Sequence, residues 1–150
     1  MTSVAEPLVE TASPAPPLEF KALLPYEPES AGKARGLVEG ALRSWELDAL
    51  IDTAVLITSE LMTNAIQTAC QRLITLAIAR TDGSLIRISV TDGSCYPPVF
   101  IDSGPANAAQ VPPRGRGLLV VDRLSKRWGL EVAARGKTVW AELHVGRRSR

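Results

Sequence analysis

Apolar residues recur every three or four positions over two segments in the first half of the chain. The first segment follows Pro28-Glu29-Ser30, which suits the first turn of a helix, and it predicts a helix over residues 28–45. The second follows Asp48, a typical N-cap residue, and its wider apolar set predicts a longer, well-buried helix. That set comprises Ile51, Val55, Leu56, Leu61, Met62, Ala65, Ile66 and Ala69.

Segments rich in β-branched and other apolar residues lie on both sides of these helices. Residues 18–24 (LEFKALL) end at Pro25 and alternate imperfectly, which predicts an edge strand. Residues 73–79 and 85–91 predict two further strands. Asp82-Gly83 lies between them and is a typical hairpin turn signal.

The second half of the chain predicts one more helix and one more hairpin. Residues 92–116 hold few large apolar residues and form a long loop, and a loop of this length in a compact domain is usually functional or mobile. A helical pattern covers residues 117–126, and strands over 128–133 and 138–145 flank Arg135-Gly136-Lys137. This order predicts an α+β fold, a two-layer sandwich whose mixed, mostly antiparallel sheet is covered by helices on one face.

Composition divides the chain into three parts. Residues 1–17 are rich in Pro, Ala, Ser, Thr and Glu and predict a disordered leader. Residues 18–145 predict a single folded domain, and residues 146–150 form a short basic tail. A chain of 150 residues with 45% hydrophobic residues is long enough to bury its own core.

Charge and residue usage exclude several classes of function. With 17 Lys and Arg against 16 Asp and Glu, and with 5% aromatic residues, the chain has neither the field nor the stacking surface expected for direct nucleic-acid or membrane-surface binding. Two cysteines without a CxxC pair and a single histidine do not make a typical zinc set. No stretch approaches a membrane span of about 20 apolar residues, and the N-terminus is not a secretory signal. We therefore expect a cytoplasmic protein.

Polar residues interrupt the apolar second helix on one face. Glu60 and Asn64 lie four residues apart, and Thr68 extends the same face by one turn. An amide oxygen is a suitable ligand for Mg²⁺, and a nearby carboxylate can orient or deprotonate a nucleophile. The same pattern also fits the solvent-facing stripe of an amphipathic helix.

Two further motifs follow strands or precede a helix. Asp92-Gly93 ends the strand over residues 85–91, where a carboxylate can accept a hydrogen bond from an exocyclic amine, although an Asx turn explains it equally. Arg114-Gly115-Arg116-Gly117 opens the third helix, where glycines and free N–H groups can bind phosphate, although solvent-exposed arginines are the alternative.

The order of these motifs is more specific than any one of them. ELMTNA (residues 60–65) resembles the N box of the GHKL superfamily, which includes histidine kinases, gyrase B and MutL. VTDGSCYPPVF and GRGLLVVDRLSKRWGLEVAARGKTVWAEL resemble the later boxes of its anti-sigma regulatory factor branch, of the actinobacterial type. The resemblance covers residues 18–145 and implies a Bergerat-type ATP-binding fold.

The resemblance implies a role for each matching residue. Asn64 would coordinate the Mg²⁺ of bound ATP, and Glu60 would be the general base for a serine hydroxyl. Asp92 would accept from the adenine amino group, with Gly93 and Ser94 beside it. The phosphates would lie on the segment that comprises Arg114, Gly115, Arg116, Gly117 and Leu118.

The chain also departs from the family pattern. Thr68 stands where many members of this branch have His, and Ser94 stands where the first glycine box has Gly. Two functions therefore remain open. One is a serine/threonine kinase that binds a sigma factor and phosphorylates a small antagonist protein, and the other is a non-catalytic ATP-binding module that regulates a partner. A homodimer is a further assembly that the resemblance implies.

Five other residues have structural or functional interpretations. Lys137 matches the family, but a soluble hairpin explains it equally well. The three tryptophans, Trp45, Trp128 and Trp140, are expected to pack the sheet against the helices. Arg35 is expected on the exposed side of the first helix, either solvated or in contact with a partner.

Overall fold

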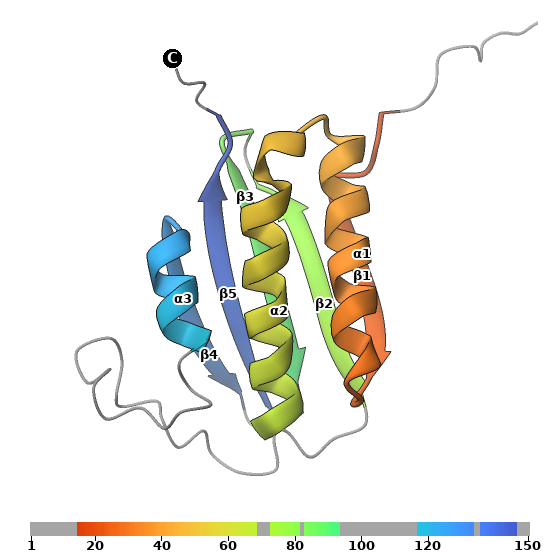
Figure 1. The fold of residues 1–150 in the computed structure, drawn as a ribbon, viewed down its shortest axis with the longest axis vertical. Helices are drawn as coiled ribbons and strands as arrows, with labels where there is room; N and C mark the ends of the chain where they lie inside the picture. Colours follow the sequence, from red (N-terminus) through yellow and green to blue (C-terminus); the bar gives the residue numbers. More distant parts are fainter. Residues whose placement is uncertain (1–14, 69–72, 82, 94–116, 134–135, 147–150) are drawn as a thin grey trace, which may run out of the picture.

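A single open sheet and three α-helices make up the described part of the chain (Figure 1). The computed structural model describes residues 15–68, 73–81, 83–93, 117–133 and 136–146. The helices are α1 (Glu29–Ser44), α2 (Ile51–Thr68) and α3 (Gly117–Leu124), with a short 3-10 turn, η2 (Asp48–Leu50), before α2. The strands are β1 (Glu19–Pro25), β2 (Leu73–Arg80), β3 (Leu85–Asp92), β4 (Arg127–Ala133) and β5 (Gly136–His144).

The sheet has five strands in the order β1-β2-β3-β5-β4, and each of its four pairings is antiparallel. β1 lies at one edge, as the imperfect alternation of residues 18–24 predicts. The three helices cover one face of the sheet (Figure 1). The predicted α+β sandwich is therefore confirmed, with antiparallel pairing throughout the described strands in place of a mixed sheet.

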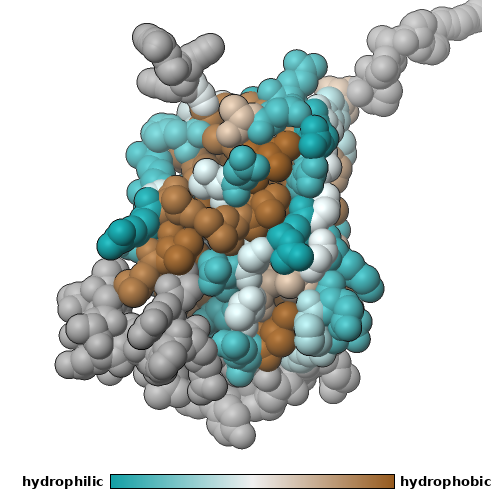
Figure 2. Space-filling model, viewed as in Figure 1, coloured by the Kyte–Doolittle hydropathy of each residue, from teal (hydrophilic) through white to brown (hydrophobic). Residues whose placement is uncertain are grey.

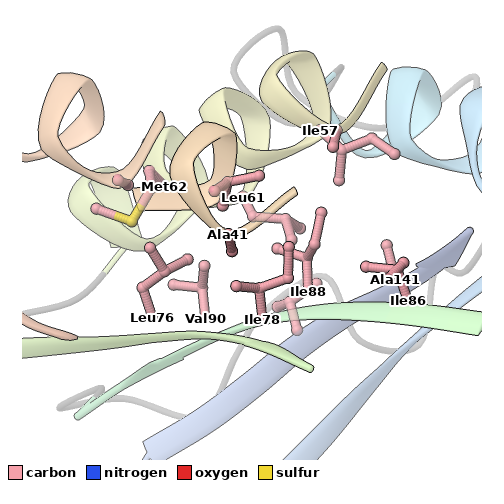
Figure 3. Close-up of a cluster of buried hydrophobic side chains, with 14 of the residues drawn as sticks. Ala41, Ile57, Leu61, Met62, Leu76, Ile78, Ile86, Ile88, Val90 and Ala141 are labelled. Carbon is pink, nitrogen blue, oxygen red and sulfur yellow. The ribbon is translucent and has the colours of Figure 1, made fainter. Parts of the chain in front are cut away.

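The core lies between the helices and the sheet. Figure 3 shows Ile57, Leu61 and Met62 of α2 directed at the inward residues of β2 and β3, which include Leu76 and Val90. Strand alternation places every second residue on this face, and the inward residues are apolar over positions 74–78 of β2 and 86–90 of β3. Burial of this continuous apolar surface holds α2 in a fixed position over the centre of the sheet.

The start of the second helix differs from the prediction. Asp48 begins η2, and α2 starts at Ile51. The Asp48 carboxylate accepts a hydrogen bond from Arg43 of α1 at 3.0 Å, so it joins two elements instead of capping α2.

The segment Asp48–Gln67 spans 20 residues with a mean hydropathy of 1.3, which by length and composition alone is enough to cross a membrane. The prediction that no segment approaches such a span is therefore wrong. The apolar residues of this segment include Ala54, Ile57 and Leu61, which are buried in the core. The core helix of a soluble protein meets the same criterion, so we assign the segment to the core.

The second hairpin also differs from the prediction. Gly136 and Lys137 already belong to β5, with Ala133 opposite Gly136 and Val132 opposite Lys137. Residues 134–135 between the two strands lie outside the described residues. Lys137 is consequently a strand residue, and its side chain is 1% exposed. The interpretation of Lys137 as a hairpin residue selected for solubility is wrong.

The three tryptophans lie on different faces of the sheet. Trp45 is buried, packs on Phe20 with ring centroids 5.6 Å apart, and donates its indole N–H to the carbonyl of Pro17 at 2.8 Å. Trp128 packs against the helix-covered core, as predicted. Trp140 lies on the opposite face, because Val139 and Ala141 on either side of it belong to that core. The prediction that Trp140 packs against the helices is wrong.

Candidate functional site

The polar face of α2 approaches the sheet near the C-terminal end of the helix. Asn64 is 7% exposed, although it is a polar residue on a core helix, and Glu60 is half-buried one turn earlier. Thr68 is the last residue of the helix. Burial of Asn64 argues against a plain solvent-facing stripe, because a solvent-facing amide would be exposed.

Asp92 is the last residue of β3 and is buried, with 3% exposed surface. Lys137 Nζ, from β5, donates a hydrogen bond to Asp92 Oδ2 at 2.5 Å, and each side chain is 1% exposed. The other carboxylate oxygen, Oδ1, is buried without a hydrogen-bond partner among the described residues. Burial raises the pKa of the Asp92 carboxyl, the ammonium group of Lys137 opposes it, and the net direction is upward.

Asn64 and Asp92 belong to the same end of the molecule. α2 and β3 run in the same direction, and α2 packs on β3 (Figure 1). Leu61 of α2 lies over the inward residues of the sheet that include Ile88 and Val90 (Figure 3). One further helical turn leads to Asn64, and two further strand residues lead to Asp92. The fold thus places two motifs that are 28 positions apart in the sequence at the same end of the packed helix and strand.

The glycine motif is described only at its end. Gly117 is the first residue of α3, and Leu118 is half-buried and packs against the core. Gly93 follows Asp92 directly and is half-buried. The predicted site residues Ser94, Arg114, Gly115 and Arg116 lie outside the described residues. Since α3 packs against α2, its N-terminus belongs to the same side of the sheet as Asn64.

Lys137 contacts the candidate site residue Asp92, and the sequence interpretation missed this contact. Its position has the same parity as Val139, Ala141 and Leu143, which all face the helices, and this alternation is a signal that could have found it. Gly136 allows the close approach of β3 and β5, because a Cβ at this position would overlap the carbonyl oxygen of Asp92.

Arg35 has a partner within the chain. Its guanidinium donates to the hydroxyl of Ser59 at 3.1 Å, and this bond connects α1 to α2 one residue before Glu60. The side chain is half-buried, so the prediction of an exposed position is wrong.

Comparison with known proteins gives one family. A family profile described as a histidine kinase-like ATPase domain matches residues 24–143. A solved structure with a similar fold is full-length ShkA in complex with AMPPNP, with a TM-score of 0.50 and 19% sequence identity. That match covers 91% of this chain and 34% of the ShkA chain, so this chain spans about a third of that protein. No curated protein matches the sequence. Since the family match extends from β1 into β5 and takes in most of the chain, this protein belongs to the histidine kinase-like ATPase domain family.

Proposed function

We propose that this protein binds Mg²⁺-ATP between α2 and the end of β3 and uses the bound nucleotide to regulate a protein partner. The observation that carries the proposal is the buried Asp92 Oδ1, an acceptor without a partner among the described residues. A buried acceptor of this kind suits the exocyclic amine of adenine. Membership of the histidine kinase-like ATPase family supports the assignment, as does the AMPPNP present in the ShkA structure.

The other residues of the proposed site bind different parts of the ligand. Asn64 would offer an amide oxygen to Mg²⁺, a cation that takes oxygen ligands. The N-terminus of α3 at Gly117, with Leu118 and with Arg114, Gly115 and Arg116 before it, offers N–H groups and positive charge to the phosphates. Gly93 and Ser94 follow Asp92 beside the adenine. The bound Mg²⁺-ATP supplies the transferable phosphoryl group.

We infer that the regulated partners are a sigma factor and a small antagonist protein, in the cytoplasm, and that transcription is the process controlled. The likeness of the motifs to the anti-sigma regulatory factor branch supports this inference. In this role Glu60 accepts the proton of a serine hydroxyl of the antagonist, the hydroxyl oxygen bonds to the γ-phosphorus, and ADP leaves. Glu60 is half-buried on the same helix as Asn64, which suits a base that must reach a second protein.

A surface for a protein partner, or for a second copy in a homodimer, is available on the helix-covered side. Figure 2 shows apolar surface over α2 and α3. Leu56 of α2 is 44% exposed and Leu124 of α3 is 36% exposed. Exposed apolar groups on neighbouring helices are a common feature of protein interaction surfaces.

The binding test is isothermal titration calorimetry with ATP, with and without Mg²⁺. Asp92→Asn should lower ATP affinity by about tenfold to a hundredfold, because it replaces a charged acceptor. Asn64→Ala should abolish most of the gain in affinity that Mg²⁺ provides. Gln67→Ala is the matched control, since it removes an exposed amide from the same helix. Wild-type affinity in Asp92→Asn would refute the site assignment.

The alternative function is a non-catalytic ATP-binding module that changes its association with a partner when nucleotide binds. Thr68, at the end of α2 where many members of the branch have His, favours this alternative. Incubation with γ-labelled ATP and candidate antagonist proteins separates the two. A kinase should transfer label, and Glu60→Gln should stop transfer without weakening ATP binding. Nucleotide-dependent binding without transfer would favour the module.

A further inference from the structure

Lys137, buried against Asp92, is the strongest feature of the described chain that the proposed function does not use. The pair lies on the helix-covered face, joins β3 to β5, and has side chains that are each 1% exposed. Removing two charges from water costs several kcal/mol each, and an ion pair in the interior often gives no net stability over apolar residues of similar size. Stability of the sheet alone therefore gives little reason for a lysine at this position.

The two oxygens of the Asp92 carboxylate have different surroundings. Oδ2 accepts from Lys137 Nζ at 2.5 Å, and Oδ1 is buried without a partner among the described residues. An ionised carboxylate can only accept hydrogen bonds, whereas a protonated carboxyl can also donate one. The difference matters for a purine, because adenine presents an amine donor at position 6 and hypoxanthine presents a carbonyl acceptor there.

We propose that Lys137 is a specificity-determining residue of the nucleotide site: it pairs with one oxygen of Asp92, keeps the carboxylate ionised, and so presents the other oxygen as an acceptor for the exocyclic amine of adenine. This proposal rests on the proposed ATP site. Without Lys137, no ammonium group would oppose the rise in the pKa of Asp92 that burial causes. The neutral carboxyl would then form a hydrogen bond with a 6-oxo purine as well as with adenine. Lys137 is thus a positioning residue that acts through Asp92.

Few other charged groups can act on Asp92 from the elements packed against it. Across β2 its neighbour is Ile74, and across β5 it is Lys137. On α2, which packs on β3, the charged residues are Asp52 in the first turn and the half-buried Glu60. Within the described residues, Lys137 is the charged group that lowers the pKa of Asp92 against the effect of burial.

The experiment compares ATP with ITP, which differs from ATP at the position-6 group and N1. Affinities of the wild type, Lys137→Met and Lys137→Arg are measured by calorimetry at pH 6 to 9. The wild type should prefer ATP by about tenfold to a hundredfold, the value of a hydrogen bond to a charged group. Lys137→Met should lose most of this preference at pH 7 and recover part of it as the pH rises, because Asp92 ionises again at higher pH. Lys137→Arg, which keeps the charge, should retain more of the preference than Lys137→Met. Lys126→Met, at an exposed lysine, is the matched control and should bind as the wild type does.

The outcomes separate this proposal from the proposed function. If the wild type does not bind ATP, the proposed function fails. If it binds ATP and prefers it over ITP, but Lys137→Met weakens both nucleotides equally, Lys137 is a structural residue and the present proposal is refuted. Where Lys137→Met does not fold, a carbon-13 titration of the Asp92 carboxyl in the wild type decides. The proposal requires the carboxylate to be ionised at pH 7, and a protonated group would overturn it.

Discussion

A methyl group added at Gly136 should disturb the end of the sheet where the proposed site lies. A Cβ at Gly136 would overlap the carbonyl oxygen of Asp92 and lie 3.1 Å from the Cα of Gly93. Both contacts are with backbone atoms, so no rotamer change can relieve them, and β5 must move away from β3. Overpacking of this kind costs about 1–3 kcal/mol. For a chain of this size each kcal/mol lowers Tm by roughly 2–4 °C, so Gly136→Ala should lower Tm by about 2–12 °C.

A glycine-to-alanine substitution within α1 should have the opposite effect on the free energy of unfolding. Gly36 and Gly40 lie within α1, and nothing lies within 4 Å of a Cβ at either position. Alanine is a better helix former than glycine by about 0.5–1 kcal/mol, so Gly40→Ala should raise the free energy of unfolding. The control therefore keeps the chemistry of the change and removes the steric overlap.

Thermal unfolding followed by circular dichroism measures both variants, and calorimetry with ATP measures the effect of Gly136→Ala on the site. The displaced strand should weaken ATP binding as well as lower Tm, because Asp92 and Lys137 lie on the two strands that separate. A Gly136→Ala protein as stable as the wild type, with unchanged ATP affinity, would refute the close approach of β3 and β5. Equal destabilisation by Gly40→Ala would show that the loss does not come from the overlap.

The face of the sheet away from the helices gives two further predictions. A Cβ on Gly129 would lie 2.5 Å from Cζ2 of Trp140, so Gly129→Ala should displace the indole, cost about 1–3 kcal/mol and change the tryptophan fluorescence. Burial raises the pKa of Glu142, but hydrogen bonds from Arg127 at 2.6 Å and Arg87 at 3.2 Å outweigh it and the net direction is downward. The stability that Glu142 contributes is therefore complete above its unfolded pKa of about 4.3 and is lost as the pH falls through the lower folded value. Urea unfolding should give the wild type a larger free energy of unfolding than Glu142→Gln at pH 7, and this difference should shrink at pH 3. A difference that is the same at both pH values would contradict the pairing.

The order of helices and strands could be predicted because the periodicity of apolar residues changes clearly along the chain. Apolar residues at helical spacing predicted α1 and α2 to within a few residues, and Asp82-Gly83 predicted the hairpin between β2 and β3. Asn64 on the core helix and Asp92 at the end of β3 are both buried, and their roles in a nucleotide site stay a prediction. The local pattern of residues is sufficient to predict an element when all the residues that define it lie within that element.

Contacts between distant residues could not be predicted in the same way. Asp48 resembled a helix cap, but its carboxylate forms an ion pair with Arg43 of α1. Lys137 was assigned to a turn because it follows a glycine, whereas the pairing of β5 with β3 and β4 places both residues inside the strand. Trp140 alternates with Val139 and Ala141, so its face could have been predicted, and the error came from assigning it by its apolar character alone.

The two ionic clusters of the sheet differ in how far their charged groups are removed from water. On the open face Glu142, which is itself 5% exposed, accepts from Arg87 and Arg127. The two arginine side chains are 35% and 62% exposed, so both cations keep part of their hydration and only the carboxylate is desolvated. On the covered face Asp92 and Lys137 are both almost fully removed from water, and replacing such a pair by apolar residues of similar size is often neutral or stabilising. The carboxylate there also retains a buried oxygen without a partner among the described residues, which adds a further cost. A ligand that donates to this oxygen offsets that cost, so nucleotide binding should raise Tm more in the wild type than in Asp92→Asn.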